Sequence, residues 1–385
     1  MEFELSEEHR MIQSLVRDFV NDRLKPLERD LLGRASDLGD AHASLSVEKE
    51  KELVDVVRDL GLWNAGVPEE FGGPGLDTLG VCLVEEELAQ TIVPFHFGDV
   101  SPVLYECNPE QREQYLGPAL RNEKQPCLAL FEPGPGADPR AMTVTAEESG
   151  DAYILNGKKF SFSRIFGDFF AVVFARTPLG PTCFIVDNGT QGMTVSAGRE
   201  TTGWMSRLRR SLTLTFENCR VSKENVLGKP GNAFHLGEKW LPLRRIIRSA
   251  RSIGVGRRLL DDAAAQAEAF SAYGQPVSRR ASIQDALADI AISVHGAALT
   301  VYEAAWKADI GRPVVQAAAV ARLAAANMLH GVADRVSHVF NGPAFFHGLP
   351  MERLCRGVLE DNVISQILKR QRAMIAGEVL KRVRL

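Results

Sequence analysis

The sequence lacks the short cysteine and histidine spacings that mark metal sites or disulfide frameworks. Its six cysteines are scattered over 385 residues without a Cys-x-x-Cys pair, and its eight histidines form no His-x-x-x-His or His-Glu-x-x-His cluster. Structural zinc sites and disulfide-rich secreted domains both depend on such spacings. We therefore expect no metal, and the reduced thiols typical of a cytoplasmic protein.

Long apolar runs and an excess of positive charge are also missing. No apolar stretch approaches the roughly 20 residues that a membrane span requires. The first residues, Met1–Leu5, are acidic and lack the apolar region of a signal peptide. The formal net charge is −4, which does not favour bulk binding of nucleic acid. The sequence thus predicts no membrane span and no nucleic-acid partner, and its length suggests two or three domains.

Helical periodicity fills the first and last thirds of the chain. Apolar residues recur at helical spacing after Ser6, a suitable N-cap. The predicted helices cover residues 6–30, 47–60, 77–90, 233–270, 278–310, 314–340 and 350–380. Long, mostly antiparallel helices at the end of the chain predict a helical bundle.

The middle third changes to the alternation typical of strands. Strands are predicted at 140–147, 152–163, 169–176, 182–187, 192–197 and 211–217. Asn156-Gly157 is a strong signal for a two-residue hairpin. We therefore predict a mainly α protein with a central β-domain: an N-terminal helical domain over 1–125, a β-barrel or sandwich over 126–230, and a helical bundle over 231–385.

The most informative run is Phe131-Glu132-Pro133-Gly134-Pro135-Gly136-Ala137-Asp138. Its two glycines permit positive φ and close approach of the main chain to a ligand, while its two prolines stiffen the loop. Main-chain N–H groups in such a loop can hold an anionic or planar ligand edge. A tight surface turn uses the same residues, so the run alone leaves both interpretations open.

Seven motifs in order resemble the acyl-CoA dehydrogenase family across nearly the whole chain. The segments that carry the resemblance are Gly61–Leu76, Glu86–Ala89, Glu132–Asp138, Asn156–Ser163, Phe216–Gly228, Tyr273–Val277 and Pro350–Arg356. Of these, Glu132–Asp138 is similar to the flavin loop Thr-Glu-Pro-x-Ala-Gly-Ser-Asp, and Asn156–Ser163 is similar to Asn-Gly-x-Lys-x-Trp-Ile-Thr.

The resemblance implies an N-terminal helical domain, a middle β-domain and a C-terminal four-helix bundle. It also implies FAD, an acyl-CoA substrate and α,β-dehydrogenation, in which a glutamate removes the α-proton and the flavin accepts hydride. Family chains form homo- or hetero-oligomers in which a neighbouring subunit completes each flavin site. Electron-transfer flavoprotein is the electron acceptor that the resemblance suggests.

The catalytic residue is unknown, because both family positions for the base are occupied by other residue types. Spacing from the Pro350–Arg356 motif places the usual glutamate at Ser365, and the alternative position falls on Arg244. An unactivated hydroxyl has too high a pKa to act as a base, and a guanidinium stays protonated. Glu360 and Asp361, one turn upstream of Ser365, could serve only if the helix shifts; a solvated acidic pair is the simpler interpretation.

The flavin positions depart from the family as well. The resemblance assigns cofactor contacts to Leu130, Phe131, Gly136, Ala137, Phe162, Ser163, Phe270, Tyr273, Val277, His338 and Gly342. Phe270 stands where the family has an arginine that reaches the neighbouring subunit's FAD pyrophosphate, and His338 replaces a glutamine. Losing one charge-assisted bond to phosphate costs roughly 1.5–3 kcal/mol. FAD binding is therefore expected to be weakened or shared with a partner subunit.

A cationic stripe lies on one predicted helix. Arg244, Arg248 and Arg251 are spaced i, i+4 and i+7, and Arg245 matches a family arginine near CoA. Arg245 and Arg248 are the candidate substrate-binding residues, for CoA phosphate or an acidic acyl tail. Salt bridges to a facing helix would explain the same stripe. The basic residues near the C-terminus are most simply a solvated face.

These features predict a subunit of an FAD-dependent acyl-CoA α,β-dehydrogenase of lipid or steroid side-chain β-oxidation, in a heterotetramer or other oligomer. A non-catalytic assembly or acyl-CoA-binding partner is one alternative. An atypical flavoenzyme, an oxygenase or an elimination enzyme with His338 or His347 as acid–base group, is another.

Overall fold

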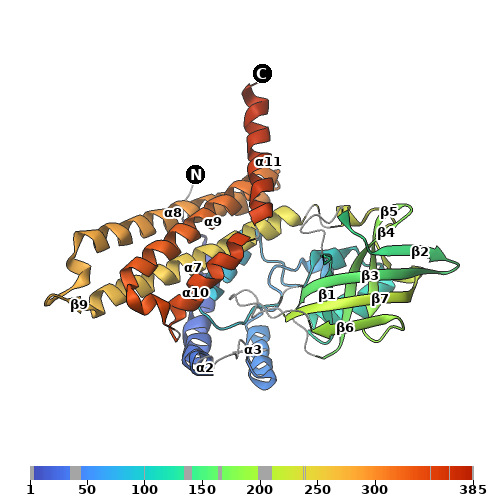
Figure 1. The fold of residues 1–385 in the computed structure, drawn as a ribbon, viewed down its shortest axis with the longest axis horizontal. Helices are drawn as coiled ribbons and strands as arrows, with labels where there is room; N and C mark the ends of the chain where they lie inside the picture. The colour runs from blue at the N-terminus through green and yellow to red at the C-terminus, as the bar shows by residue number, and fades with distance from the viewer. Residues whose placement is uncertain are drawn as a thin grey trace.

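A computed structural model describes residues 4–34, 45–98, 100–133, 141–163, 167–197, 210–236, 238, 240–346, 348–363 and 365–383. Helices at the N-terminus, a central sheet and a C-terminal helical bundle follow one another along the chain (Figure 1). The mainly α fold with a β-domain in the middle is thus confirmed. None of the described helices is long and apolar enough to cross a membrane.

The N-terminal part is built from helices, of which the apolar periodicity predicted those before residue 90 and not the two short ones after it. They are α1 (Glu7–Phe19), a π-turn at Val20–Leu24, a 3₁₀ turn at Lys25–Leu27, α2 (Glu28–Arg34), α3 (Val47–Asp59), α4 (Thr78–Leu88), α5 (Pro109–Gln111) and α6 (Gly117–Leu120). The Ser6 hydroxyl caps α1 as predicted, accepting a bond from the His9 N–H at 3.1 Å. The α3 helix is followed by Gly61, whose φ of 72° suits glycine without strain.

One eight-stranded sheet forms the middle part. Its strands are β1 (Gln125–Ala129), β2 (Thr145–Ser149), β3 (Ala152–Ser163), β4 (Phe169–Thr177), β5 (Gly180–Asp187), β6 (Met193–Ala197), β7 (Arg210–Ser222) and β8 (Val226–Leu227). Their order is β6-β7-β3-β2-β4-β5-β8, and β1 adds to β4 in parallel. The continuous apolar run of β4 is buried on both faces, which places it at the centre of the sheet.

The predicted hairpin at Asn156-Gly157 is wrong. Both residues lie inside β3, and the register against β7 shifts between Leu155 and Gly157, which is a β-bulge. Gly157 adopts a φ of 131°, and a Cβ there would meet the Val144 side chain at 2.8 Å. Asn156 uses its side-chain oxygen to accept the Asn218 N–H at 2.8 Å. The dipeptide therefore serves a bulge and a close backbone approach, the second common use of glycine within strands.

The C-terminal part consists of long helices. They are α7 (Leu241–Ala269), α8 (Ala281–Asp309), α9 (Val315–Phe340), α10 (Pro350–Val363) and α11 (Ser365–Val383), with a small ribbon of β9 (Ser271–Ala272) and β10 (Gln275–Pro276) between α7 and α8. The single helix predicted over 350–380 is instead two helices. Figure 1 shows α11 leaving the body of the bundle.

Helices α4 and α7 cross so closely that the main chain of α4 contacts the backbone of α7 at Gly254. A Cβ on Gly254 would lie 2.0 Å from the Glu86 carbonyl oxygen and 2.9 Å from the Ala89 Cβ. One turn earlier, Arg251 Nε meets Glu85 Oε2 at 2.8 Å, and neither side chain is more than 19% exposed. Only glycine allows the two helices to approach this closely.

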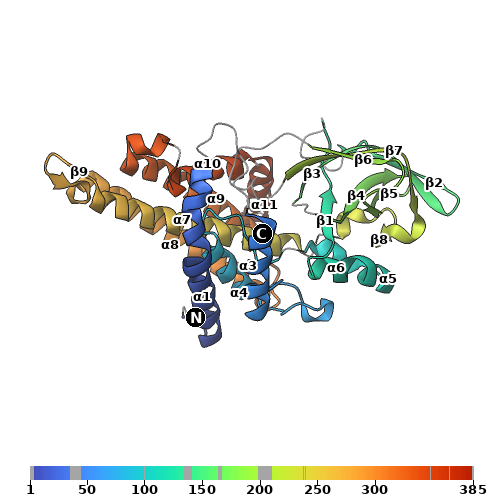
Figure 2. The ribbon, with the colours of Figure 1, turned by 90° about the horizontal axis from the view of Figure 1, so that it is seen from below.

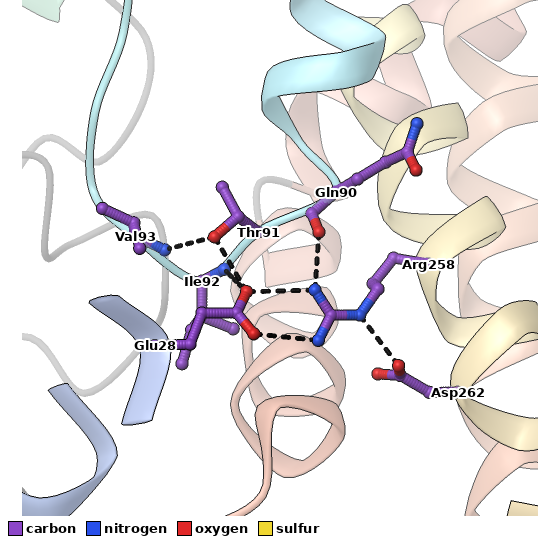
Figure 3. A network of polar contacts seen from close by, with 7 residues as sticks. All are labelled: Glu28, Gln90, Thr91, Ile92, Val93, Arg258 and Asp262. Atoms are coloured by element: carbon purple, nitrogen blue, oxygen red, sulfur yellow. Dashed lines mark hydrogen bonds and ion pairs between the residues drawn. The ribbon is translucent and has the colours of Figure 1, made fainter. Parts of the chain in front are cut away.

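A buried polar network fastens α2, the segment after α4, and α7 (Figure 3). The Arg258 guanidinium donates to both Glu28 carboxylate oxygens at 3.0 and 2.9 Å, to the Gln90 carbonyl at 2.7 Å and to Asp262 at 2.8 Å. Glu28 also accepts from the Thr91 hydroxyl at 2.8 Å. A bidentate pair of this kind is specific in geometry as well as strong, so it fixes how the N-terminal helices sit on the bundle.

A second buried carboxylate, Glu86, lies on the other side of the crossing. Its side chain pairs with Arg257 at 2.5 Å and accepts the Tyr302 hydroxyl at 2.6 Å. Burial raises the pKa of Glu86 to about 6, although Arg257 and Tyr302 act in the opposite direction. The two carboxylates together tie α2, α4, α7 and α8 into one unit.

Aromatic contacts join the N-terminal helices to the start of α7. Phe71 stacks on Tyr105 at 4.4 Å between ring centroids, and Tyr105 meets Trp240 edge-on at 5.2 Å. The Arg112 guanidinium lies 4.9 Å from the centre of the Phe71 ring. Trp240 immediately precedes α7, so this cluster fixes the end of the helix that faces the sheet.

Gly254→Ala should destabilise the fold by about 3 kcal/mol or more, because its methyl group has no free space between α4 and α7. Urea unfolding followed by circular dichroism measures this. Gly296→Ala in α8 is the matched control: nothing lies within 4 Å of its Cβ, and alanine should stabilise that helix by about 0.5–1 kcal/mol. Equal effects of the two changes would contradict the proposed role of the crossing.

Candidate functional site

The glycine-rich run begins at a buried ion pair. Lys159 Nζ lies 2.7 Å from Glu132 Oε1, and the side chains are 0% and 2% exposed. Glu132 Oε2 also accepts from the Thr143 N–H and hydroxyl, both at 2.6 Å, and Oε1 accepts from the Val144 N–H at 3.1 Å. Glu132 therefore joins the start of the glycine-rich run to residues 143 and 144, beyond its end, and Lys159 holds both to strand β3.

Burial and hydrogen bonding act in opposite directions on this pair. Burial alone would raise the pKa of Glu132, but the bonds from Lys159 and Thr143 outweigh it and lower that pKa. Burial lowers the pKa of the Lys159 ammonium, and the bond to Glu132 only partly offsets this effect. The carboxylate is thus the better stabilised member, because it has four donors, while Lys159 has one further acceptor, the Leu130 carbonyl at 3.2 Å.

The main chain between these anchors is held in a strand-like position. Phe131 forms an isolated antiparallel bridge with Phe160, whose N–H donates to the Phe131 carbonyl at 2.7 Å. Because Leu130 and Glu132 are the inward neighbours, the Phe131 side chain points outward and is 38% exposed. Gly136 and Ala137 lie outside the described residues, and Phe162 and Ser163 are placed in β3 with side chains that lie outside them.

The other predicted flavin contacts lie at the opposite end of the bundle. Figure 1 places β9 at the tip farthest from the sheet; Phe270 directly precedes β9, and Tyr273 lies in the turn between β9 and β10. Phe270 is 45% and Tyr273 98% exposed, whereas Val277 is buried at 3%. A helix of 29 residues such as α7 is about 43 Å long. One chain therefore cannot bring this tip to its own Phe131.

Two more predicted contacts follow at the end of α9. His338 is in the last turn of that helix, and its side chain is 81% exposed, with Asp334 4.0 Å away. A Cβ on Gly342 would have nothing within 4 Å, so the position is open. Asn341, directly before it, adopts a φ of 54°. Since α8 returns toward the sheet, α9 runs in the same direction as α7 and ends at the distal side of the bundle.

The two base positions lie at the opposite end of the bundle from that tip. Arg244 is in the first turn of α7 and Ser365 is the first residue of α11. In Figures 1 and 2 these two helix starts lie side by side. The side chains of Ser365, Glu360 and Asp361, and the whole of His347, lie outside the described residues.

The cationic stripe divides in the structure. Arg251 forms the ion pair with Glu85 described above, so a salt bridge to a facing helix accounts for this residue. Arg244, Arg245 and Arg248 are partly buried on the first two turns of α7. Arg245 has no carboxylate partner among the described residues, and burial followed by the charge of Arg370 lowers its pKa.

The residues fit one end of FAD and not the other. At the sheet, a rigid main-chain edge and an outward Phe131 ring offer what a planar heterocycle needs: backbone polar groups and an aromatic neighbour. At the distal tip, Phe270 offers no charge to a pyrophosphate, and the ion pair of His338 is with Asp334. Among the described residues, no group of three His, Cys, Asp or Glu side chains could hold a metal ion.

The sequence motifs did not identify Thr143 and Lys159 as functional residues. Lys159 lies within a motif that carries the family resemblance, and a buried lysine is rare unless it is paired. A signal for the pair exists in the sequence: an acidic residue that opens the glycine-rich run and a lysine on the second strand after it. Thr143 carries no such signal, because its hydrogen bonds to Glu132 depend on how the two segments come together in the fold.

The family models that match this chain all describe domains of one family. Models of the N-terminal, middle and C-terminal domains of acyl-CoA dehydrogenase match residues 6–123, 127–219 and 234–365. Short-chain specific acyl-CoA dehydrogenase of Mus musculus mitochondria is 31% identical over 393 residues, covering 99% of this chain and 92% of that protein. Subunit CarC of the caffeyl-CoA reductase-Etf complex of Acetobacterium woodii is 27% identical over 391 residues, covering 98% and 99%.

Among solved structures, butyryl-CoA dehydrogenase from Megasphaera elsdenii is similar over the whole length. The TM-score is 0.84 at 26% sequence identity, with 99% of this chain and 100% of that chain covered.

Lys159→Met should cost about 3–5 kcal/mol of unfolding free energy, because it leaves the Glu132 carboxylate buried without its cation. The double change Glu132→Gln/Lys159→Met should recover much of that loss, since it leaves no buried unpaired charge and the one amide oxygen can still accept from the Thr143 N–H and hydroxyl. A double-mutant cycle in urea measures the coupling.

Lys307→Met, which breaks the surface pair with Glu303 on α8, is the control and should cost less than about 0.5 kcal/mol. A double variant as unstable as Lys159→Met would show that the burial of an unpaired charge is not the cause.

Proposed function

This chain belongs to the acyl-CoA dehydrogenase family, and we propose that it is a subunit of an FAD-dependent acyl-CoA dehydrogenase that shares its flavin with a neighbouring family chain and does not itself supply the proton-abstracting carboxylate. The observation that carries the proposal is a contrast between two parts of the chain. The buried Glu132–Lys159 pair forms a clamp at the start of the glycine-rich run. By contrast, Ser365 and Arg244 stand at the base positions, and Phe270 stands where the family has an arginine.

The clamp supports retention of the ring end of the site. A charged pair removed from water with five hydrogen bonds is a costly arrangement that does not improve stability over an apolar one. Its value is that it fixes the main chain of residues 130–132 and 159–160 where a planar ligand would lie. Bound flavin supplies the hydride acceptor; this chain's residues supply the edge that orients it.

The distal tip supports sharing of the flavin. In an oligomer this tip belongs to the neighbouring chain's site, and here it presents Phe270 and Tyr273 instead of a cation. A homo-oligomer would therefore leave the pyrophosphate without its arginine. A hetero-oligomer, in which another family chain lends an arginine to this chain's flavin, would not.

The residues at the base positions support a subunit without its own base. A base for an α-proton needs a pKa near the working pH, which a serine hydroxyl and an arginine do not have. Ser365 also begins a new helix that turns away from the bundle. The ligand is nevertheless an acyl-CoA, in our proposal from lipid or steroid side-chain breakdown. We propose an electron-transfer flavoprotein as the redox partner, and the relative CarC is named as a subunit of a caffeyl-CoA reductase-Etf complex.

The chain purified alone should be colourless, and co-expression with an arginine-bearing family chain should yield a complex with the visible absorption of oxidised flavin. The reason is the missing cation at Phe270. Phe270→Arg is the matched variant: it should raise FAD affinity of a homo-oligomer by at least about tenfold, the equivalent of one charge-assisted bond. A chain that retains flavin alone, with no gain in Phe270→Arg, would contradict sharing.

Ser365→Glu should raise desaturation at this chain's own flavin site by about 10²-fold or more, because a positioned general base contributes that much. The rate is measured in a flavin-loaded complex whose partner chain has had its own base replaced by glutamine. Ser365→Gln, of the same shape without a carboxylate, is the control and should stay at the starting rate. Absence of any gain in a flavin-loaded Ser365→Glu protein that still binds acyl-CoA would show that more than the base is missing.

A further inference from the structure

Helix α8 carries a line of exposed apolar residues. Four residues on it or directly after it are between 42% and 71% exposed: Ile292, Leu299, Trp306 and Ile310. The first three are spaced seven residues apart, which is close to two helical turns, so they lie along one face of the helix. Single exposed apolar residues are common, whereas these four, here called the α8 stripe, form a patch of the kind found at protein–protein contacts.

The opposite face of α8 is covered by its own chain. Val294, Val301 and Ala305 are buried where α8 packs against α4, α7 and α9. Figure 1 shows α8 at the edge of the bundle, with α9 next to it. The α8 stripe therefore points away from the helices that the structure packs against α8.

Two charged residues of opposite sign lie at the two ends of α8. Three acids of the helix have a partner within the chain: Asp289, Glu303 and Asp309. The remaining acid, Asp285, is exposed near the start of the helix and has no cationic partner in the described part of the chain. Arg312, just past the end of the helix, has no described carboxylate partner either, and its guanidinium lies 5.5 Å from the centre of the Trp306 ring.

This arrangement is complementary to itself when a second α8 runs in the opposite direction. A two-fold axis at Leu299 places Ile292 of each copy opposite Trp306 of the other, because both are seven residues from the axis. The same axis brings Asp285, near the start of one helix, beside Arg312, past the end of the other. A parallel pair would instead set each of these two charges against its own copy, and like charges repel.

We propose that a second copy of this chain docks on the α8 stripe through its own α8, in an antiparallel helix pair centred on Leu299. A single pair of helices forms a small interface, so the association is reversible at about micromolar concentration. The contact joins like chains and does not depend on the proposed flavin chemistry. A complex that also contains the chain sharing the flavin would then hold two copies of this one.

Sedimentation velocity of the purified full chain at increasing concentration tests the contact. The parent chain should self-associate, and Leu299→Asp should weaken the association by at least about tenfold, because two carboxylates would face each other across the axis. Leu299 is exposed in the single chain, so this variant should keep the circular dichroism spectrum of the parent. Met11→Asp, at an exposed apolar position on α1, is the matched control and should associate as the parent does.

An exchange of charges tests the antiparallel direction. Asp285→Arg alone and Arg312→Asp alone should each weaken self-association by at least about tenfold, because each change places like charges side by side at both ends of the pair. The double change Asp285→Arg/Arg312→Asp should restore the affinity of the parent. In a parallel pair each residue would face its own copy, so the double change would restore nothing.

A chain that stays monomeric up to about 100 μM would overturn the proposal, as would an association that Leu299→Asp leaves intact. Equal affinities of the single and double charge variants would overturn the antiparallel pair. The flavin content of the same preparations reports separately on the proposed function. Self-association that depends on Leu299 and on the two charges supports the α8 contact, whether or not a partner chain brings flavin.

Discussion

The approach of α4 to α7 at Gly254 is the constraint on which the rest of the structure depends. The Glu86 carbonyl occupies the space that any side chain at 254 would need. Near this contact three arginines of α7 form ion pairs with carboxylates: Arg251 before it, and Arg257 and Arg258 after it. The crossing thereby sets the direction of α7, whose first turn meets the aromatic cluster at Trp240 and whose last turn carries the β9–β10 ribbon.

Charge on α7 is arranged in two different ways along one helix. In its middle, each of these arginines is matched by a buried or half-buried acid, and the pairs hold α2 and α4 in place. At its start, Arg245 has a cation for a neighbour and no acid among the described residues. The paired arginines thus account for the packing of α7 on α2 and α4, whereas Arg245 forms no ion pair with a described carboxylate.

Much of the fold could be predicted from sequence, because helical periodicity and capping are local. The extents of α3, α8 and α9 follow from apolar spacing within a few residues. The failures have non-local causes. Asn156-Gly157 carries the local signal of a turn, but pairing of β3 with β7 and contact with Val144 convert it into a bulge. The break between α10 and α11 has no proline or glycine to mark it.

The candidate site was predictable in part. The glycine-rich run drew attention to the segment that Glu132 opens, and its role as a flavin loop stays a prediction. The buried Glu132–Lys159 pair could not be predicted, because it depends on two segments meeting in space. Phe131 lies at the sheet, whereas Phe270 precedes β9 at the tip farthest from the sheet. Residue spacing alone could not show this separation, because it depends on the direction of α7. The roles of Gly136, Ala137 and the Ser365 side chain stay predictions.

The Gly254 contact also has a consequence for how the sequence can vary in evolution. Because main chain meets main chain there, the geometry of the crossing is indifferent to the side chains around the reacting centre. A change of side chain at the proposed base position or at Phe270 would therefore leave this crossing unaltered. Similarity of fold among such chains reflects common ancestry, whereas their catalytic activity depends on a few side chains that the fold does not require.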